Sequence, residues 1–150
     1  MSSSNSGRIK IQMRQVADIR PETFLEGAKP FWDKGYLFMV VELEASGYVE
    51  ETVGCCMMDF IARCEKDVML LDYHTLRTVL AASSVDTCII KVFRPGTPLS
   101  EMVACRNEEN TAFVEMELTD GEVWELYAED LRFNRAFMKV WQDADIEREC

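Results

Sequence analysis

The sequence predicts a mainly β fold of the α+β class, with helices expected near both ends of the chain. Two stretches, Tyr36–Glu44 (YLFMVVELE) and Val85–Phe93 (VDTCIIKVF), are rich in β-branched and aromatic residues, which is typical of strands. A third stretch, TAFVEMELTDGEVWELYAED, has two alternating runs that meet at Asp120-Gly121. An Asp-Gly pair between alternating apolar residues predicts a β-hairpin.

Length and composition predict a globular chain with one ordinary domain or two very small ones. The chain has 150 residues, and 48% of them are hydrophobic, which is enough to bury a core. Only residues 1–7 (MSSSNSG) lack any apolar anchor, and we expect them to form a disordered tail.

In the first half of the chain, residues 8–35 are expected to hold a strand and a short broken helix. The strand begins at Ile9, where the pattern alternates, and the helix is interrupted by Pro30. Between Val53 and Cys64, apolar residues recur at helical spacings, which favours a helix. A buried strand with bends is the alternative for that segment.

In the second half, VMLLDY (residues 68–73) is expected to be a strand, and TLRTVLAASS (residues 75–84) either a helix or a strand. LSEMVAC (residues 99–105) is expected to be a weaker strand. EDLRFNRAFMKVWQDAD has an apolar side at helical spacing. It predicts a C-terminal helix, so residues 134–150 are assigned to that helix and a tail.

The charge of the chain limits its direct partners. It has 27 acidic and 16 basic residues, a formal net charge of −11, and the basic residues are scattered. A nucleic-acid partner needs a basic stripe to replace its counterions, so direct nucleic-acid binding is not expected. The acidity would attract a basic peptide or a basic protein surface. The alternative is that it only keeps a small domain in solution.

The chain shows no sign of a membrane or secretory address. No apolar run approaches the roughly 20 residues that a membrane span needs, and no hydrophobic segment follows a positive start. The six cysteines lack paired CxxC spacing, as expected in a reducing compartment. These features predict a cytoplasmic or nuclear protein without membrane contact.

Two segments, residues 36–84 and 85–133, have similar patterns when the chain is shifted by about 48 positions, which places Asp72 on Asp120. Within the second, VEMELTDGEVWELYAEDLR resembles the end of a Tudor-type module of the SH3-like barrel class. VMLLDYHTLRTV in the first is similar to the same pattern. The resemblance implies one or two SH3-like barrels, arranged in tandem and flanked by the N-terminal strand and broken helix and by the C-terminal helix.

A Tudor-type module implies an aromatic cage for a methylated ammonium or guanidinium group, in which ring faces attract the cation. In the first repeat the cage would comprise Tyr48, Phe60, Asp72 and Tyr73, and in the second Phe93, Asp120, Trp124 and Tyr127. For Phe60, Phe93 and Trp124 the alternative is core packing. Tyr73, expected in a turn and half-exposed, is the strongest of these candidates.

No catalytic or cofactor pattern is present in the sequence. His74 is the only histidine, and no nucleophile motif, metal-ligand spacing or phosphate-binding glycine loop accompanies it. We therefore expect a non-enzymatic adaptor, without metal or cofactor, that binds a protein or a basic peptide, unmodified or methylated. The alternative is a single α+β domain with a structural or oligomer-forming role, which includes self-association.

Overall fold

The described residues of the protein form an antiparallel sheet of seven strands, accompanied by helices. The computed structural model describes residues 9–14, 35–106, 113–120, 123–128 and 145–148. In chain order the strands are β1 (Ile9–Arg14), β2 (Leu37–Gly47), β3 (Leu70–Leu71), β4 (Ser83–Phe93), β5 (Val114–Thr119), β6 (Val123–Ala128) and β7 (Asp145–Arg148).

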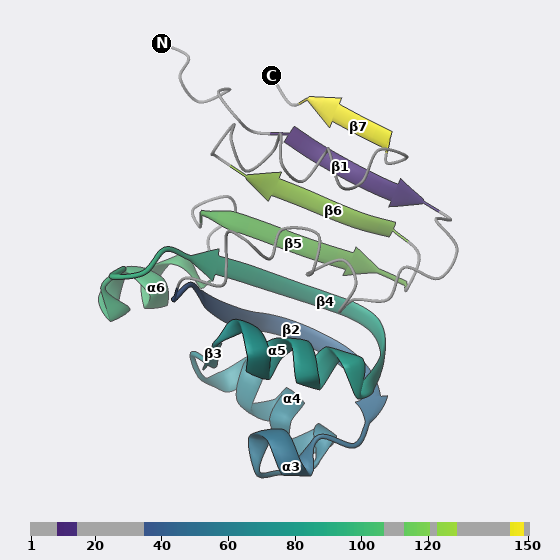
Figure 1. Ribbon diagram of the computed structural model, residues 1–150, viewed down its shortest axis with the longest axis vertical. Coiled ribbons are helices and arrows are strands. Elements are labelled where there is room, and N and C mark those ends of the chain that lie inside the picture. Colours follow the sequence, from purple (N-terminus) through teal and green to yellow (C-terminus); the bar gives the residue numbers. More distant parts are fainter. Residues whose placement is uncertain (1–8, 15–34, 107–112, 121–122, 129–144, 149–150) are drawn as a thin grey trace.

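The strands lie in the order β3-β2-β4-β5-β6-β1-β7, and every neighbouring pair is antiparallel (Figure 1). The two outermost strands are β3 and β7, which are not paired with each other, so the sheet is open. The expected closed SH3-like barrel is therefore not the arrangement of these strands. The coarser expectation of an α+β fold is confirmed.

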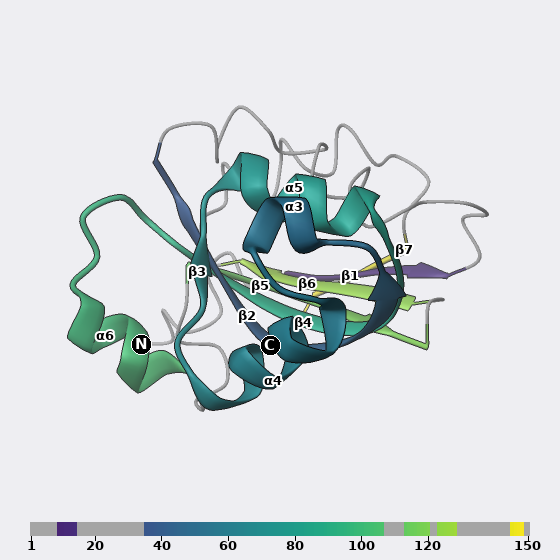
Figure 2. The ribbon, with the colours of Figure 1, turned by 90° about the horizontal axis from the view of Figure 1, so that it is seen from below.

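The described helices are α3 (Glu50–Val53), α4 (Met57–Lys66), α5 (Tyr73–Ala81) and α6 (Leu99–Cys105). The first three pack together near β2 and β3, whereas α6 lies apart from them, beside one end of β4 (Figure 1). Seen from the side of the β3 edge, α6 again stands clear of the other three helices (Figure 2). The first three helices thus share the main core, and α6 is a separate feature.

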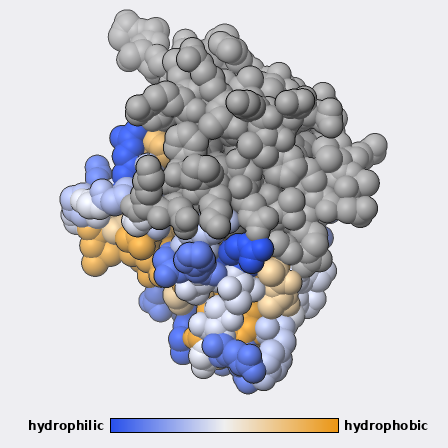
Figure 3. Space-filling view, in the orientation of Figure 1, coloured by the Kyte–Doolittle hydropathy of each residue, from blue (hydrophilic) through white to orange (hydrophobic). Residues whose placement is uncertain are grey.

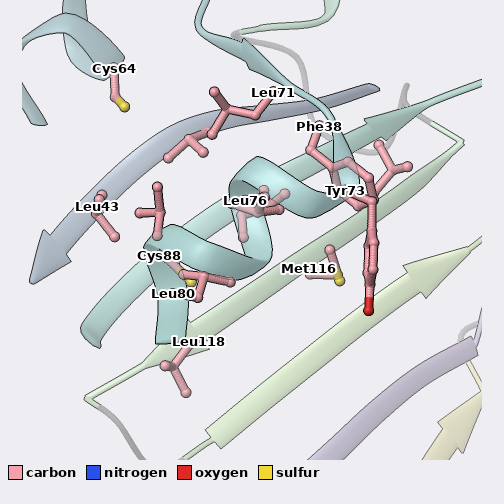
Figure 4. Close-up of a cluster of buried hydrophobic side chains, with 14 of the residues drawn as sticks. Phe38, Leu43, Cys64, Leu71, Tyr73, Leu76, Leu80, Cys88, Met116 and Leu118 are labelled. Atoms are coloured by element: carbon pink, nitrogen blue, oxygen red, sulfur yellow. The ribbon is translucent and has the colours of Figure 1, made fainter. Parts of the chain in front are cut away.

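The main core lies between one sheet face and the helices α3 to α5. Because side chains alternate along a strand, one set of residues on each of β2, β4 and β5 enters this core. The set comprises Phe38, Val40, Leu43, Cys88, Ile90, Val92, Val114, Met116 and Leu118. Leu76 and Leu80 of α5 join the same cluster, as Figure 4 shows.

A second, smaller cluster lies on the other face of the sheet. Met39 and Phe93 point to that side, and Met102 and Cys105 of α6 pack against them. Partly buried side chains of β2, of β3 and of the segment before β3 surround this cluster, namely Leu37, Val41, Val68 and Leu70. The side chains of β2 and β4 that point away from the main core therefore determine where α6 packs.

The helix expected between Val53 and Cys64 is confirmed from Met57 onward, whereas residues 54–56 separate α4 from the short helix α3. In α4, Met57, Phe60 and Cys64 are buried at spacings of three and four residues, so they share one face of the helix. Asp59 lies in the first turn, and basic residues lie in the last turn, which suits the helix dipole. The alternative of a buried strand is excluded for residues 57–66.

The stretch from Leu70 onward changes from strand to helix at Asp72. The strand expected over residues 68–73 is limited to Leu70–Leu71. The Asp72 side chain accepts a hydrogen bond of 2.7 Å from the backbone N–H of Thr75, which caps α5. For the following segment, where helix and strand were both open, the structure shows a helix.

The expectation of a strand over residues 99–105 is wrong, because this segment is α6. The Pro98 carbonyl accepts hydrogen bonds from the N–H groups of Glu101 and Met102 at 3.0 and 3.1 Å and begins the helix. Met102 and Cys105, three residues apart, then face the second cluster. A helix buries that pair on one side, whereas a strand would separate them onto opposite faces.

The predicted hairpin is confirmed. β5 and β6 pair antiparallel from Val114↔Ala128 to Thr119↔Val123, and Asp120 has a positive φ of 53°, as a tight turn requires. The predicted N-terminal strand is confirmed as β1. Asp145–Arg148, assigned to the C-terminal helix and tail, is instead the strand β7.

Several expectations lie outside the described residues. These are the tail over residues 1–7, the broken helix after residue 14, and all but the last residue of the C-terminal helix expected over residues 129–145.

The two segments that looked similar in sequence differ in structure. A shift of 48 positions superimposes the strand β2 on the strand β4, but it superimposes the helix α5 on the strand β6.

Candidate protein-interaction surface

The first group of cage candidates does not form an exposed cluster. Phe60 is 1% exposed and Tyr73 is 3% exposed, and both belong to the main core. Tyr73 was expected to be half-exposed in a turn, but it is the first residue of α5 and faces the core. Tyr48 is 67% exposed, and its hydroxyl lies 3.4 Å from Glu50 Oε2. Asp72 is exposed and caps α5.

The second group of cage candidates is spread over three places: the end of β4, the β5–β6 turn and the strand β6. Phe93 is buried in the cluster beneath α6, whereas Asp120 is exposed in the β5–β6 turn. Trp124 and Tyr127 lie on β6, where they pair with Leu118 and Glu115 of β5. Phe93 therefore supports the sheet and does not present a ring face to solvent.

Two of the cysteines, Cys64 and Cys88, are buried in the main core. Burial raises the pKa of the Cys64 thiol to about 12, against a smaller lowering by Arg106, and burial raises the pKa of Cys88 to about 12. Both thiols stay protonated at neutral pH and are poor nucleophiles. Within the described ranges, His, Cys, Asp and Glu side chains form no group of three that could hold a metal ion.

A hydrogen-bonded turn leads the chain from β4 into α6. The Thr97 side chain donates to the Arg94 carbonyl at 2.7 Å, and Thr97 N–H donates to the same oxygen at 3.2 Å. Gly96 has a φ of 85°, a conformation that glycine adopts without strain. The Arg94 guanidinium lies 4.4 Å from the ring centre of Phe113, a cation–π contact. The turn thus fixes where α6 starts.

The end of α6 is fastened by a buried lysine. Lys91, on the α6 side of β4, is 3% exposed, and its ammonium donates to the Cys105 carbonyl at 2.6 Å. Its Nζ lies 3.9 Å from Glu115 Oε1 on β5. A helix leaves its last carbonyls without partners, so a cation at that end completes it. Lys91 therefore joins α6 to the middle of the sheet.

Arg106, directly after α6, joins this helix to the end of α4. Its guanidinium donates to the carbonyl of Cys64 and, at 3.4 Å through Nε, to that of Asp67. Val68 and Leu70 pack on the same small cluster as Met102. The helix α6 and the β3 edge are therefore neighbours, although about thirty residues separate them along the chain.

The outer face of α6 is apolar and exposed. Leu99 is 60% exposed and Val103 is 49% exposed. They lie four residues apart and hence on one side of the helix. In Figure 3 a hydrophobic patch covers α6 at the left of the molecule. We call the exposed side chains Leu99 and Val103, together with the neighbouring edge segment Asp67–Leu71, the α6–β3 surface.

Sequence reasoning missed this surface because LSEMVAC was interpreted as a strand. Two signals could have identified it. Pro98 stands directly before the segment, a common position for a residue that begins a helix. The apolar residues also form two helical pairs, Met102 with Cys105 inward and Leu99 with Val103 outward.

Comparison with protein-family models, with curated proteins and with solved structures finds no match to the chain. A further finding concerns the helices: in the part of the chain that the structure describes, none has the length and apolar character needed to cross a bilayer.

Proposed function

We propose that this protein is a non-enzymatic interaction module that binds a basic segment of another protein through the α6–β3 surface. The observation behind the proposal is the pair Leu99 and Val103, which stand exposed on a helix that is fastened at both ends. A rigid helix with apolar side chains turned outward can bury them against a partner with little loss of conformational entropy.

The charge of the chain supports a basic partner. The formal net charge is −11, which draws in positively charged segments and repels acidic ones. Near the surface, the exposed acidic side chains include Asp67 and Glu101. Leu99 and Val103 would contribute the buried contact area, and the negative charge would favour basic partners over acidic ones.

The aromatic-cage mode that the Tudor-type resemblance implies receives less support. It requires ring faces open to solvent, whereas Phe60, Tyr73 and Phe93 have an exposure of 3% or less. The proposed partner is therefore a basic segment, and its lysine or arginine residues need not be methylated.

The test is a binding titration with a small set of fluorescent peptides. Each has lysines at both ends and an alternating valine–leucine centre, and a matched set carries glutamate in place of lysine. We expect the lysine peptides to bind and the glutamate peptides not to bind. Affinity should fall as salt rises, because added ions screen the charges.

Variants locate the contact. Leu99→Asn and Val103→Asn each replace an exposed apolar side chain with a neutral polar one, and each should weaken binding about fivefold or more, as for a central interface residue. Met58→Asn is the matched control, because Met58 is 81% exposed but lies on α4. Equal binding by all three variants, or no binding of any lysine peptide, would refute the proposal.

A further inference from the structure

β3 forms one edge of the open sheet. It pairs with β2 on one side only, through Phe38↔Leu71 and Met39↔Leu70, and no strand of the described ranges pairs with its other side. Figure 2 looks toward this edge and shows β3 at the near side of the sheet, between α6 and the remaining helices. Sheet edges are sites where an extended segment can add as a further strand.

The backbone direction along β3 can be read from one hydrogen bond. Val40 N–H donates to the Met69 carbonyl at 3.4 Å, so Met69 faces β2. In an antiparallel ladder, successive residues direct their N–H and C=O groups alternately to the two sides. Val68 and Leu70 therefore direct their backbone groups away from β2, toward the outer side.

From this arrangement we infer that the partner segment binds as an extended strand added to the outer side of β3, with an apolar side chain packed on Leu99 and Val103. This inference rests on the proposed function and specifies its geometry. The added strand would exchange hydrogen bonds with the backbone of Val68 and Leu70. Figure 1 shows α6 on the same side of the molecule as β3.

The charges beside β3 define the chemistry of the added segment. The four apolar residues Val68 to Leu71 are flanked by Asp67 and Asp72, which are both exposed. Lys66 and Arg106 lie beside Asp67 and carry positive charge. The preference for a basic segment therefore rests on the Asp72 end and on the formal net charge of −11 of the chain. Opposite charges placed across neighbouring strands stabilise the pairing. The matching segment therefore has a short apolar centre with lysine or arginine at both ends.

A second copy of this chain is the other occupant that an edge strand can attract. Each copy carries a formal charge of −11, so two copies repel one another, whereas a basic segment is attracted. The contact with α6 adds apolar area that an edge of two residues alone would not provide. The basic segment is therefore the occupant we assign.

The experiment uses the full chain labelled with ¹⁵N and the lysine peptide with the valine–leucine centre, unmodified or N-methylated at its central amides. N-methylation removes the hydrogen-bond donors of the added strand but keeps its side chains and charge. With the unmodified peptide, exchange of the Val68 and Leu70 amide protons should slow by about tenfold or more, because they become hydrogen-bonded. The N-methylated peptide should bind about tenfold more weakly and give no protection.

The second part of the experiment reverses the charge of Asp67. Asp67→Lys should weaken binding of the lysine peptide and improve binding of the glutamate peptide. Asp86→Lys makes the same charge change at an exposed position of β4, seven residues before Phe93 and thus about 23 Å along the strand, and it should leave the preference for lysine unchanged.

The outcomes separate this inference from the proposed function. If both peptides bind equally, with shifts at Leu99 and Val103 but no protection at Leu70, strand addition is refuted while the proposed function stands. If no lysine peptide binds, both are refuted. If Leu70 becomes protected in the free protein as its concentration rises, the occupant of the edge is a second copy and the assignment to a basic segment is wrong.

Discussion

The ammonium group of Lys91, which is buried beneath α6, donates to the carbonyl oxygen of Cys105 at a distance of 2.6 Å. This contact joins the last turn of α6 to the end of β4, two residues before Phe93. Because α6 also carries the exposed residues Leu99 and Val103, the stability of the proposed docking surface depends on a residue that no partner would touch.

Replacement of Lys91 should loosen α6. Lys91→Met leaves the Cys105 carbonyl and the Glu115 carboxylate without this donor, and we expect a loss of about 1–3 kcal/mol in the free energy of unfolding. Denaturant unfolding measures the loss, and hydrogen exchange should show faster exchange in α6 than in α5. Lys66→Met, at an exposed position of α4, is the control and should change stability by less than about 0.5 kcal/mol. Wild-type stability and unchanged exchange in Lys91→Met would contradict this role.

Phe60 should behave as a core residue. It is 1% exposed, so Phe60→Ala leaves a cavity and should lower the free energy of unfolding by about 3–5 kcal/mol. Tyr48→Ala, at 67% exposure, should cost less than about 0.5 kcal/mol. Chemical denaturation of the two variants checks both values. Comparable losses for the two would show that the burial assigned to Phe60 is incorrect.

Much of the sheet could be predicted from the sequence, because its strands have strong local signals. β2 and β4 are rich in β-branched and aromatic residues, and the β5–β6 hairpin has an Asp-Gly turn. Whether the strands close into a barrel or form an open sheet could not be predicted. An SH3-like barrel and an open sheet use the same alternating segments, and the difference lies in long-range pairing, such as that of β1 with both β6 and β7.

Asp72 should stabilise α5 as a helix cap, and more strongly while it is ionised. The hydrogen bond from Thr75 N–H holds the pKa of the Asp72 carboxyl below its usual value of 3.8. A lowered pKa gives stability that is present above the unfolded-state pKa and is lost as pH falls through the folded-state pKa. Asp72→Ala should therefore cost about 1 kcal/mol at neutral pH, and the difference from wild type should shrink in strong acid.

Asp72→Asn separates the charge from the cap. Asparagine caps a helix about as well as aspartate, so this variant should keep most of the stability at neutral pH. Its stability relative to wild type should improve as the pH falls below 3.8. Thermal unfolding as a function of pH gives both comparisons. A difference between Asp72→Ala and wild type that is independent of pH would contradict the lowered pKa.

The cysteines should differ sharply in reactivity. Cys56 is exposed, whereas the pKa of Cys64 and that of Cys88 are raised to about 12 by burial. At pH 8 the buried thiols would contain on the order of a thousandfold less thiolate than an ordinary cysteine. Brief alkylation with iodoacetamide followed by peptide mass spectrometry should therefore modify Cys56 and spare the other two. Rapid modification of Cys64 in the folded protein would contradict its burial.

The proposed docking surface was harder to predict than the sheet. Its apolar pair, Leu99 and Val103, lies in seven residues whose pattern also suits a strand, and the choice depends on the second cluster formed with Met39 and Phe93. Tertiary packing decides between helix and strand in so short a segment. Three of the cage candidates, Phe60, Tyr73 and Phe93, are buried for a related reason. Aromatic residues at helical spacing, such as Phe60 and Tyr73, more often complete a core than line a surface.

The most direct test of the account is an amide NMR titration of the labelled chain with the lysine peptide, unmodified and with methylated lysines. We expect chemical-shift changes to concentrate at Leu99, Val103 and the Asp67–Leu71 edge, with similar affinity for both peptides. Changes concentrated instead at Tyr48 or Trp124, and stronger for the methylated peptide, would contradict the α6–β3 surface and support an aromatic cage.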